Sequence, residues 1–223
     1  MRKATPLARP ARSLPRSAER RLRACPHTPG EPEPTPDRIA RDLTDRIPRM
    51  GRHHRAVAEL AAAVARHIGL EGPRLHAVVR AAELHDVGKI LVPEAILNKP
   101  GALTEDELAL MRRHAIAGYV ILSESGEPAP IPALVRSSHE RWDGAGYPDG
   151  LSGEDIPLGS RIITICDAYD AMTNERPYRA ARSAAEALDE LRLGAGVKYD
   201  PCLVSVFATV VGTAGQLATR AIQ

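Results

Sequence analysis

Residues 81–90 read AAELHDVGKI, and the pair His85 and Asp86 inside this stretch decides the fold prediction. Apolar residues before the pair recur every three or four positions from Leu75 onward, which predicts an amphipathic helix ending at Gly88. Adjacent helical residues point about 100° apart, so both side chains reach the interior only if that interior is polar. A divalent transition metal would make it polar. On its own, the pair is more simply explained as a solvated or capping pair at a helix end.

Composition favours a helical domain. The chain has 223 residues, enough for one domain with a sizeable core. Apolar residues make up 43% but aromatic residues only 3%, so the core must be built from Ala, Leu, Val and Ile, which favours helices over sheets. The formal charge is only +2, with most of the excess in the first few dozen residues. This balance argues against a nucleic-acid polymer as a partner.

Cysteine usage and hydropathy predict the compartment. The three cysteines, Cys25, Cys166 and Cys202, lie far apart and form no CxxC pair. They argue for a reducing compartment and against a cysteine-based zinc site. No apolar run reaches the roughly 18 residues of a membrane span, and no apolar signal core follows the basic N-terminus. We therefore expect a cytoplasmic protein without a membrane segment.

The chain divides into a tail and one folded domain. Residues 1–36 are rich in Pro and Arg and lack a sustained apolar period, so they bury too little surface to offset their ordering entropy. We expect a disordered tail over 1–36 and one domain over 37–223.

Several histidines fall on predicted inward helix faces. His53 precedes Val57 by four residues, and the same spacing argument places His114 and His139 inward, whereas His54 is expected to point elsewhere. Each one alone is more often a satisfied core residue than a metal ligand. Together, on separate helices, they are hard to explain as packing, because each would need its own hydrogen-bond partner.

Carboxylates add to this pattern. The largely apolar helix predicted over residues 160–172 brings either Asp167 or Asp170 toward the interior, and a carboxylate is rarely buried unpaired. A shared metal site would satisfy the acidic groups and the imidazoles at once, as in other helical bundles. The donor set contains His and Asp without Cys, which is typical of iron, manganese or zinc hydrolytic centres.

A long loop follows His139. Residues 140–160 are rich in Gly, Pro and Asp, and a loop of this length in a compact domain is usually functional or disordered. Trp142 and Tyr147 argue against disorder.

Three stretches resemble the HD-GYP family, a branch of the HD-domain metal-dependent phosphohydrolases. They are HDVGK at 85–89, HERWDGAGYPDGLSGEDIPLGSRI at 139–162 and TNERPYR at 173–179. The resemblance covers roughly Arg49 to Phe207. It implies an all-α HD-domain bundle of about seven to eight helices with a long GYP loop, which corresponds to the loop over residues 140–160. It also implies hydrolysis of the bacterial messenger cyclic di-GMP to pGpG, to GMP or to both.

The resemblance also implies a set of site residues. Carried over by position, the metal ligands are His53, His85, Asp86, His114, His139 and Asp167. Asp86 would bridge two ions, and Lys89 would lie near the scissile phosphate. Arg176 and Arg179 would contact the phosphates of the substrate, and Tyr147 would lie at the pocket mouth.

Two positions depart from the family pattern. Ser138 stands where a second consecutive histidine is expected, and Arg49 stands where members with a third metal carry Glu. We therefore expect one or two ions, iron or manganese, with zinc and magnesium as alternatives.

These departures leave more than one function open. One hypothesis is an active cyclic di-GMP phosphodiesterase with reduced activity. The other is a weakened module for nucleotide sensing or protein–protein signalling that uses the GYP loop as its contact surface. A phosphohydrolase that uses one metal on another nucleotide is a third interpretation.

Overall fold

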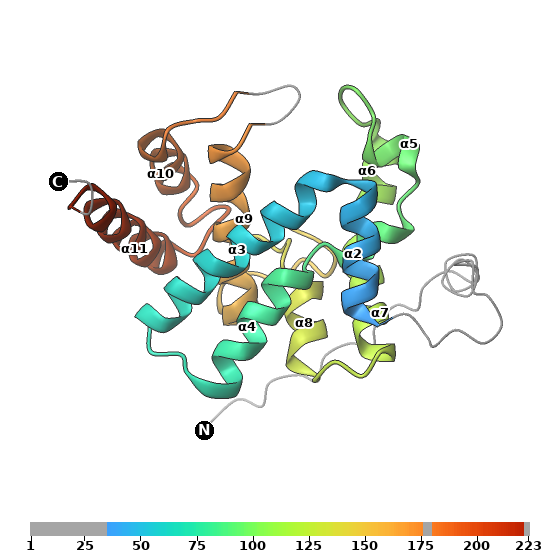
Figure 1. Cartoon of the computed structure of the whole chain (residues 1–223), viewed down its shortest axis with the longest axis horizontal. Coiled ribbons are helices and arrows are strands. Elements are labelled where there is room, and N and C mark those ends of the chain that lie inside the picture. The colour runs from blue at the N-terminus through green and yellow to red at the C-terminus, as the bar shows by residue number, and fades with distance from the viewer. Residues whose placement is uncertain (1–34, 176–179, 221–223) are drawn as a thin grey trace. The chain divides into compact units, whose positions relative to one another are not determined.

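The structure is a computed structural model that describes residues 35–175 and 180–220. The predicted tail therefore lies almost wholly outside the described residues. Within these ranges all regular structure is helical (Figure 1), which confirms the predicted all-α class. The elements are α2 (Pro36–Arg46), α3 (Pro48–His67), α4 (Gly72–Leu84), η1 (Val87–Leu91), α5 (Glu94–Leu97), α6 (Glu105–Arg112), α7 (His114–Glu124), α8 (Pro130–Arg136), η2 (Gly153–Asp155), α9 (Leu158–Thr173), α10 (Ala184–Leu193) and α11 (Pro201–Arg220).

Several of these helices begin at residues that favour a helix N-terminus. Pro48 occupies the first turn of α3 and separates it from α2, because proline lacks the N–H that would continue the preceding helix. Thr104 starts α6 with a complete capping box, its hydroxyl and the Glu107 carboxylate each bonding the other residue's backbone N–H. Ser183 starts α10 in the same way.

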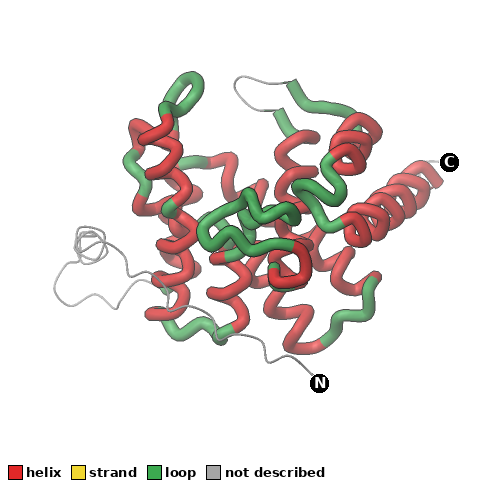
Figure 2. The backbone as a smooth tube through the Cα atoms, turned by 180° about the vertical axis from the view of Figure 1, so that it is seen from behind, coloured by secondary structure: helices red, strands yellow, loops and turns green. Residues whose placement is uncertain are grey.

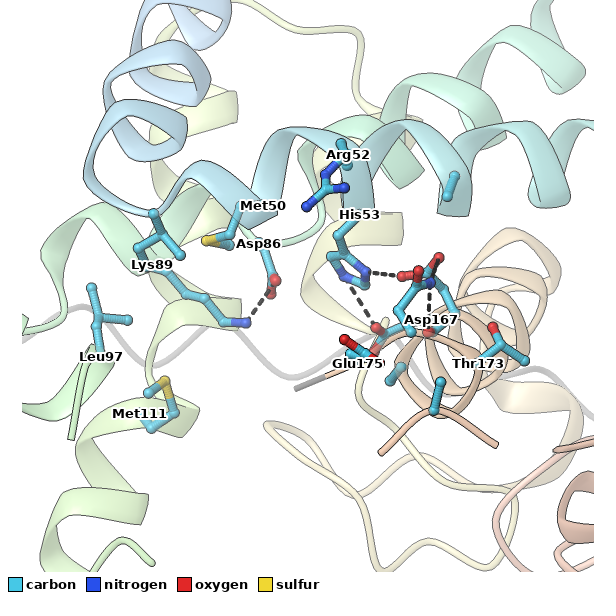
Figure 3. A pocket seen from close by; sticks show the side chains of 16 residues that line it. Met50, Arg52, His53, Asp86, Lys89, Leu97, Met111, Asp167, Thr173 and Glu175 are labelled. Atoms are coloured by element: carbon cyan, nitrogen blue, oxygen red, sulfur yellow. Dashed lines mark hydrogen bonds and ion pairs between the residues drawn. The ribbon is translucent and has the colours of Figure 1, made fainter. Parts of the chain in front are cut away.

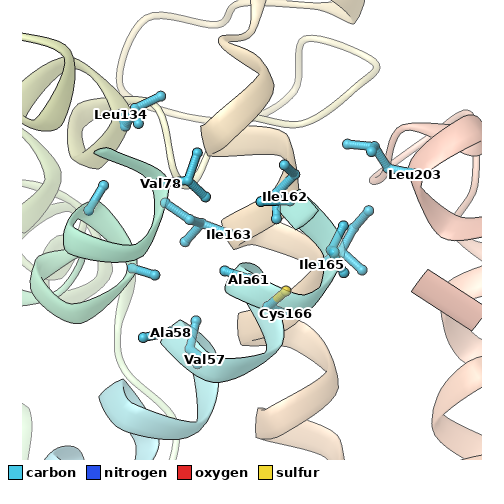
Figure 4. Packing of buried hydrophobic residues seen from close by; sticks show 14 of the residues in the cluster. Val57, Ala58, Ala61, Val78, Leu134, Ile162, Ile163, Ile165, Cys166 and Leu203 are labelled. Atoms are coloured by element: carbon cyan, nitrogen blue, oxygen red, sulfur yellow. The ribbon is translucent and has the colours of Figure 1, made fainter. Parts of the chain in front are cut away.

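The core is aliphatic and centres on α3. This helix packs against α4 and α9, and Figure 4 shows side chains from all three helices meeting in one cluster. Val57 and Ala61 of α3 and Ile163 and Cys166 of α9 are fully buried. Phe207, the one phenylalanine of the chain, adds the largest fully buried side chain from α11. This packing fixes α3 beside α9, and both helices carry residues of the site.

One predicted helix is two helices in the structure. The spacing of Leu108, Met111 and Ala115 predicts one helix with these residues on its inward face, but the helix breaks at Arg113, and Leu108 is 38% exposed. The Arg113 N–H bonds the carbonyl of Leu110, three residues back, and this tighter turn separates α6 from α7. The break divides one predicted helix into α6 and α7.

The loop between α8 and α9 crosses the middle of the domain when it is seen from behind (Figure 2). The Trp142 N–H bonds the carbonyl of Lys198, and the Trp142 carbonyl accepts from the Gly153 N–H. The Arg161 guanidinium lies 5.8 Å from the centre of the indole ring, a cation–π contact. The loop is therefore attached to the segment before α11 and to α9. None of the described helices is long and apolar enough to cross a membrane.

Candidate metal centre

His85 and Asp86 lie in the turn between α4 and η1. The helix ends at Leu84, so the prediction that it ends at Gly88 is wrong; Gly88 lies inside η1. Because the backbone leaves the helix before Asp86, both side chains can face the interior, and both are buried. Gly88 has another role: a Cβ there would overlap the carbonyl oxygen of His114. Its lack of a side chain lets η1 lie directly against α7.

One group of donor atoms comes from His53, His85 and Asp86, whose ligand atoms lie within 4.8 Å of one another. The Nδ1 atom of His85 lies 2.8 Å from the carbonyl oxygen of Ala82. A carbonyl can only accept, so Nδ1 carries the proton and Nε2 keeps its lone pair. Nε2 is buried without a hydrogen-bond partner in the part of the chain that the structure describes. It is therefore available as a ligand.

A second group comes from Asp86, His114 and His139. His114 Nδ1 lies 2.8 Å from the carbonyl oxygen of Met111, which directs its Nε2 lone pair inward by the same argument. That Nε2 lies 3.4 Å from Asp86 Oδ1 and 2.7 Å from His139 Nε2. Burial lowers the pKa of both histidines, that of His139 to about 3. Both imidazoles are thus neutral at pH 7, as metal ligation requires.

Asp86 belongs to both groups. Its side chain is 3% exposed; Oδ2 lies 2.6 Å from Lys89 Nζ, and Oδ1 has no hydrogen-bond partner among residues 35–175 and 180–220. Burial alone would raise the pKa of Asp86, but the Lys89 ammonium and the nearby imidazoles hold the pKa well below its ordinary value. The carboxylate is therefore ionised and can bridge two cations.

His53 is held by two carboxylates of α9. Its Nε2 lies 3.3 Å from Asp167 Oδ1, and its Nδ1 lies 2.6 Å from Asp170 Oδ2 (Figure 3). Burial favours the neutral imidazole, but the contacts with Asp167 and Asp170 outweigh it and raise the pKa of His53 to about 9. The sequence left open which of the two aspartates turns inward. In the structure Asp170 is the more buried, and Asp167 stands outside the two donor groups but beside His53.

Two residues of the donor groups, His53 and Asp86, line a cavity of about 720 Å³. Figure 3 shows Lys89 reaching into it toward Asp86 from one side, with His53 and Asp167 on the other. The volume lies within the range of about 300–1,000 Å³ common for small-ligand sites. Arg176 and Arg179, predicted to contact phosphates, lie outside the described residues.

Tyr147 lies against His139 of the second donor group. Its ring stacks on that of His139, with the centroids 5.1 Å apart and the planes inclined by 14°. The Arg112 guanidinium lies 5.4 Å from the tyrosine ring centre. Tyr147 is not among the described residues that line the cavity, and its predicted position at the pocket mouth stays a prediction.

The GYP loop is held around a buried carboxylate. Glu140 is 1% exposed and accepts hydrogen bonds from the N–H groups of Asp149 and Gly150 at 2.7 and 3.1 Å. Arg136, in the last turn of α8, clamps the Asp149 carboxylate through two bonds of 2.7 Å. This framework positions Tyr147 against His139.

The segment after α8 differs from the prediction at His139. We expected a helix to carry His139, but α8 ends at Arg136, and His139 lies in the following turn. Ser138 is buried, and its hydroxyl donates to the carbonyl of Val135 at 2.8 Å. The hydroxyl proton is therefore used in a hydrogen bond to the backbone. A neutral hydroxyl is in any case a poorer metal ligand than an imidazole.

His54 is a buried residue of the site that was not predicted from the sequence. We expected its ring to point elsewhere, but it is 7% exposed and lies 5.3 Å from the His85 ring, centroid to centroid. A signal was present in the sequence: His54 is three, four and seven residues before the buried Val57, Ala58 and Ala61. This spacing places it on the buried stripe of α3.

A protein-family comparison matches the HD domain model to residues 38–203. The chain belongs to the HD-domain family. The cyclic di-GMP phosphodiesterase response regulator RpfG of Xanthomonas campestris is 40% identical over 188 residues, covering 83% of this HD-domain chain and 50% of the relative. A 3'3'-cGAMP-specific phosphodiesterase of Vibrio cholerae is 35% identical over 170 residues, covering 75% of this chain and 33% of the relative. The chain thus spans half or less of the length of these curated relatives, which confirm the resemblance stated from the motifs.

Solved structures show the same fold. An HDG"Y"P protein from Bdellovibrio bacteriovorus aligns with a TM-score of 0.61 at 19% sequence identity, covering 88% of this chain and 62% of that one. At this identity the likeness supports the HD-domain architecture alone.

The donor atoms fit a divalent metal. His85 and His114 each donate Nδ1–H to a backbone carbonyl and direct Nε2 inward, the usual arrangement of metal-ligating histidines. His85 Nε2 and Asp86 Oδ1 are buried and lack partners within the described ranges, and a buried unsatisfied polar atom is otherwise destabilising. A bound cation would satisfy both atoms.

Proposed function

We propose that this HD domain is a metal-dependent phosphodiesterase that opens cyclic di-GMP to pGpG, GMP or both. The observation that carries the proposal is the sharing of Asp86 by two groups of donor atoms beside a cavity. Relatives of about 40% identity are named cyclic di-GMP phosphodiesterases. Free Cys166 and Cys202 agree with a cytoplasmic location, where a cyclic dinucleotide messenger is available.

Each predicted ligand has a role in this proposal. His53, His85, Asp86 and Asp167 hold the first ion, and Asp86, His114 and His139 hold the second. Bound divalent ions lower the pKa of water toward neutrality and stabilise charge on the attacked phosphate. Imidazole and carboxylate donors without sulfur suit iron or manganese, and zinc or magnesium are alternatives.

The remaining residues bind and orient the substrate. Lys89 Nζ is held by Asp86 Oδ2 inside the cavity, where its ammonium can pair with a phosphate oxygen or protonate the leaving oxygen. From the family resemblance, Arg176 and Arg179 bind non-bridging phosphate oxygens, since guanidinium groups match phosphate geometry.

One observation favours a second candidate function. Ser138 donates its hydroxyl to Val135, so the second ion has one imidazole fewer than the family pattern supplies. A weakly held second ion would reduce hydrolysis and leave a module that binds a cyclic dinucleotide or a signalling protein. In that case the GYP loop supplies the contact surface.

Purified protein loaded with Mn²⁺ or Fe²⁺ and assayed against cyclic di-GMP and 3'3'-cGAMP distinguishes these functions. We expect turnover of cyclic di-GMP that Asp86→Ala abolishes. Asp189→Ala, which removes an exposed carboxylate on α10 paired only with Arg192 in the described part, should leave the rate unchanged. Binding without turnover supports the second candidate, and a preference for 3'3'-cGAMP contradicts the proposed substrate.

A further inference from the structure

His54 is buried beside the metal centre but is absent from the ligand set implied by the family resemblance. It follows His53 on α3 and lies on that helix's buried stripe with Val57 and Ala58. Its ring centroid is 5.6 Å from that of His53 and 5.3 Å from that of His85. Three imidazoles are therefore grouped around one point, although only two of them were predicted ligands.

The inward nitrogen of His54 lacks a hydrogen bond within the described part of the chain. Nε2 is buried and makes no hydrogen bond to any residue that the structure describes. Asp86 Oδ2 lies 3.8 Å away, which is too long for a hydrogen bond. Burying such an atom without a partner is unfavourable. An ordinary core histidine would satisfy this nitrogen with a carbonyl or a hydroxyl group.

The distance between His54 and Asp86 suits two atoms bound to one ion. Metal–nitrogen bonds of about 2.0–2.1 Å place two ligand atoms roughly 3 to 4 Å apart. His54 Nε2 is 3.8 Å from Asp86 Oδ2, and His85 Nε2 is 3.6 Å from the same oxygen. His54 thus shares two features with His85, namely a buried Nε2 without a hydrogen-bond partner among the described residues and a ligand-like distance to Asp86. It stands outside the donor group of His53, His85 and Asp86.

We propose that His54 is a further metal ligand, adding an imidazole to the first ion alongside His53, His85 and Asp86. The inference rests on the metal centre of the proposed function but not on its substrate. The added imidazole would strengthen the first position and would not replace the one missing at Ser138, which lies on the His114 and His139 side. The protein would then hold its first ion firmly and its second weakly.

The test is metal binding by the full chain. Mn²⁺ affinity is measured by titration calorimetry, and Co²⁺ is used for visible absorption, which depends on the number and type of ligands. We expect His54→Val to weaken the first ion at least about 10-fold and to change the Co²⁺ spectrum. His67→Val, at the exposed end of the same helix, should change neither. These readouts remain informative if cyclic di-GMP proves not to be the substrate.

Two further measurements separate ligation from packing. Without metal, His54→Val should unfold at the wild-type temperature or higher, because it removes a buried unpartnered nitrogen. His54→Gln keeps polarity and hydrogen bonding but should lose the same affinity as His54→Val. Wild-type affinity and Co²⁺ spectrum in His54→Val would overturn the proposal. So would full rescue by His54→Gln, or a loss of stability in both variants that is equal with and without metal.

Discussion

Nδ1 of His53 lies 2.6 Å from Oδ2 of Asp170, and this contact orients the imidazole so that Nε2 faces Asp167 and the cavity. Asp170 also accepts from the Asn174 side chain at 2.8 Å. The aspartate is thus fixed from two sides and acts as the outer partner of a proposed metal ligand, a position that commonly tunes metal affinity.

We predict that Asp170→Ala weakens the first ion by about 10- to 100-fold, because His53 loses the acceptor that orients its ring. Asp170→Asn keeps a hydrogen-bond acceptor and should lose much less metal affinity. Calorimetric Mn²⁺ titration of the three proteins measures the difference. Equal affinities for wild type and Asp170→Ala would show that the contact does not position His53.

The pKa of His53, about 9 without metal, predicts proton release on metal binding. At pH 7.5 the imidazole is largely protonated, and ligation requires its neutral form, so binding of the first ion should release about one proton. Apparent affinity should rise roughly tenfold per pH unit below pH 9 and level off above it.

Calorimetry in buffers of different ionisation enthalpy counts this proton. His114 and His139 have lowered pKa values and should contribute none, so His53→Gln should bind metal without net release. Release that persists in His53→Gln would assign the proton to another group.

Ser138→His should strengthen the second metal position. The substitution places an imidazole where the family pattern expects one, and metal content per chain should move from near one toward two, with faster turnover. Ser138→Ala is the matched control. The Ser138 hydroxyl donates a hydrogen bond to the carbonyl of Val135, so its removal should leave the metal content at the wild-type value. Metal analysis of the purified proteins provides the count. An unchanged count in Ser138→His would remove Ser138 as the cause of a weak second site.

Gly88→Ala should destabilise the domain by about 3 kcal/mol or more, because the added methyl overlaps the backbone at His114 and forces η1 away from α7. Gly212→Ala in α11 is the control, since no described atom lies within 4 Å of its added Cβ. There the alanine should be neutral or stabilise by up to about 1 kcal/mol. Urea unfolding of both variants measures the contrast. A small effect at Gly88 would mean that the two segments separate easily.

Tyr147→Ala should lower stability by about 0.5–1.5 kcal/mol beyond the loss of buried area, through the ring stacked on His139. Tyr147→Phe keeps the ring and should resemble wild type. Thermal unfolding compares them, with Mn²⁺ titration to follow the second position. If Tyr147→Phe lowers stability as much as Tyr147→Ala, the hydroxyl and not the ring stacking is the stabilising group.

The sequence predicted the class of fold and the convergence of the histidines better than the local path of the backbone. The starts of α6 and α10 were readable because Thr104 and Ser183 make local bonds to residues three positions on. The position of His139 was not, because α8 ends before it, and the GYP loop that holds it depends on the contacts of Glu140 with residues nine and ten positions away.

His54 shows why the inward orientation of some site residues was not predicted. Its neighbour His53 also has an apolar residue, Val57, four positions on, and a single spacing cannot tell which of two adjacent histidines is more buried. The further spacings to Ala58 and Ala61 favour His54, and the burial of each ring is then set by the rotation of α3 against α4 and α9. Asp170 was ambiguous beside Asp167 for the same reason.

The attachment of the GYP loop has an optical consequence. Trp142 is the one tryptophan of the chain, and its backbone joins the loop to Lys198 and Gly153. Selectively excited indole fluorescence therefore reports the surroundings of this loop alone, close to the Arg161 guanidinium. Movement of the loop can be followed in the unlabelled protein by emission wavelength and quenching.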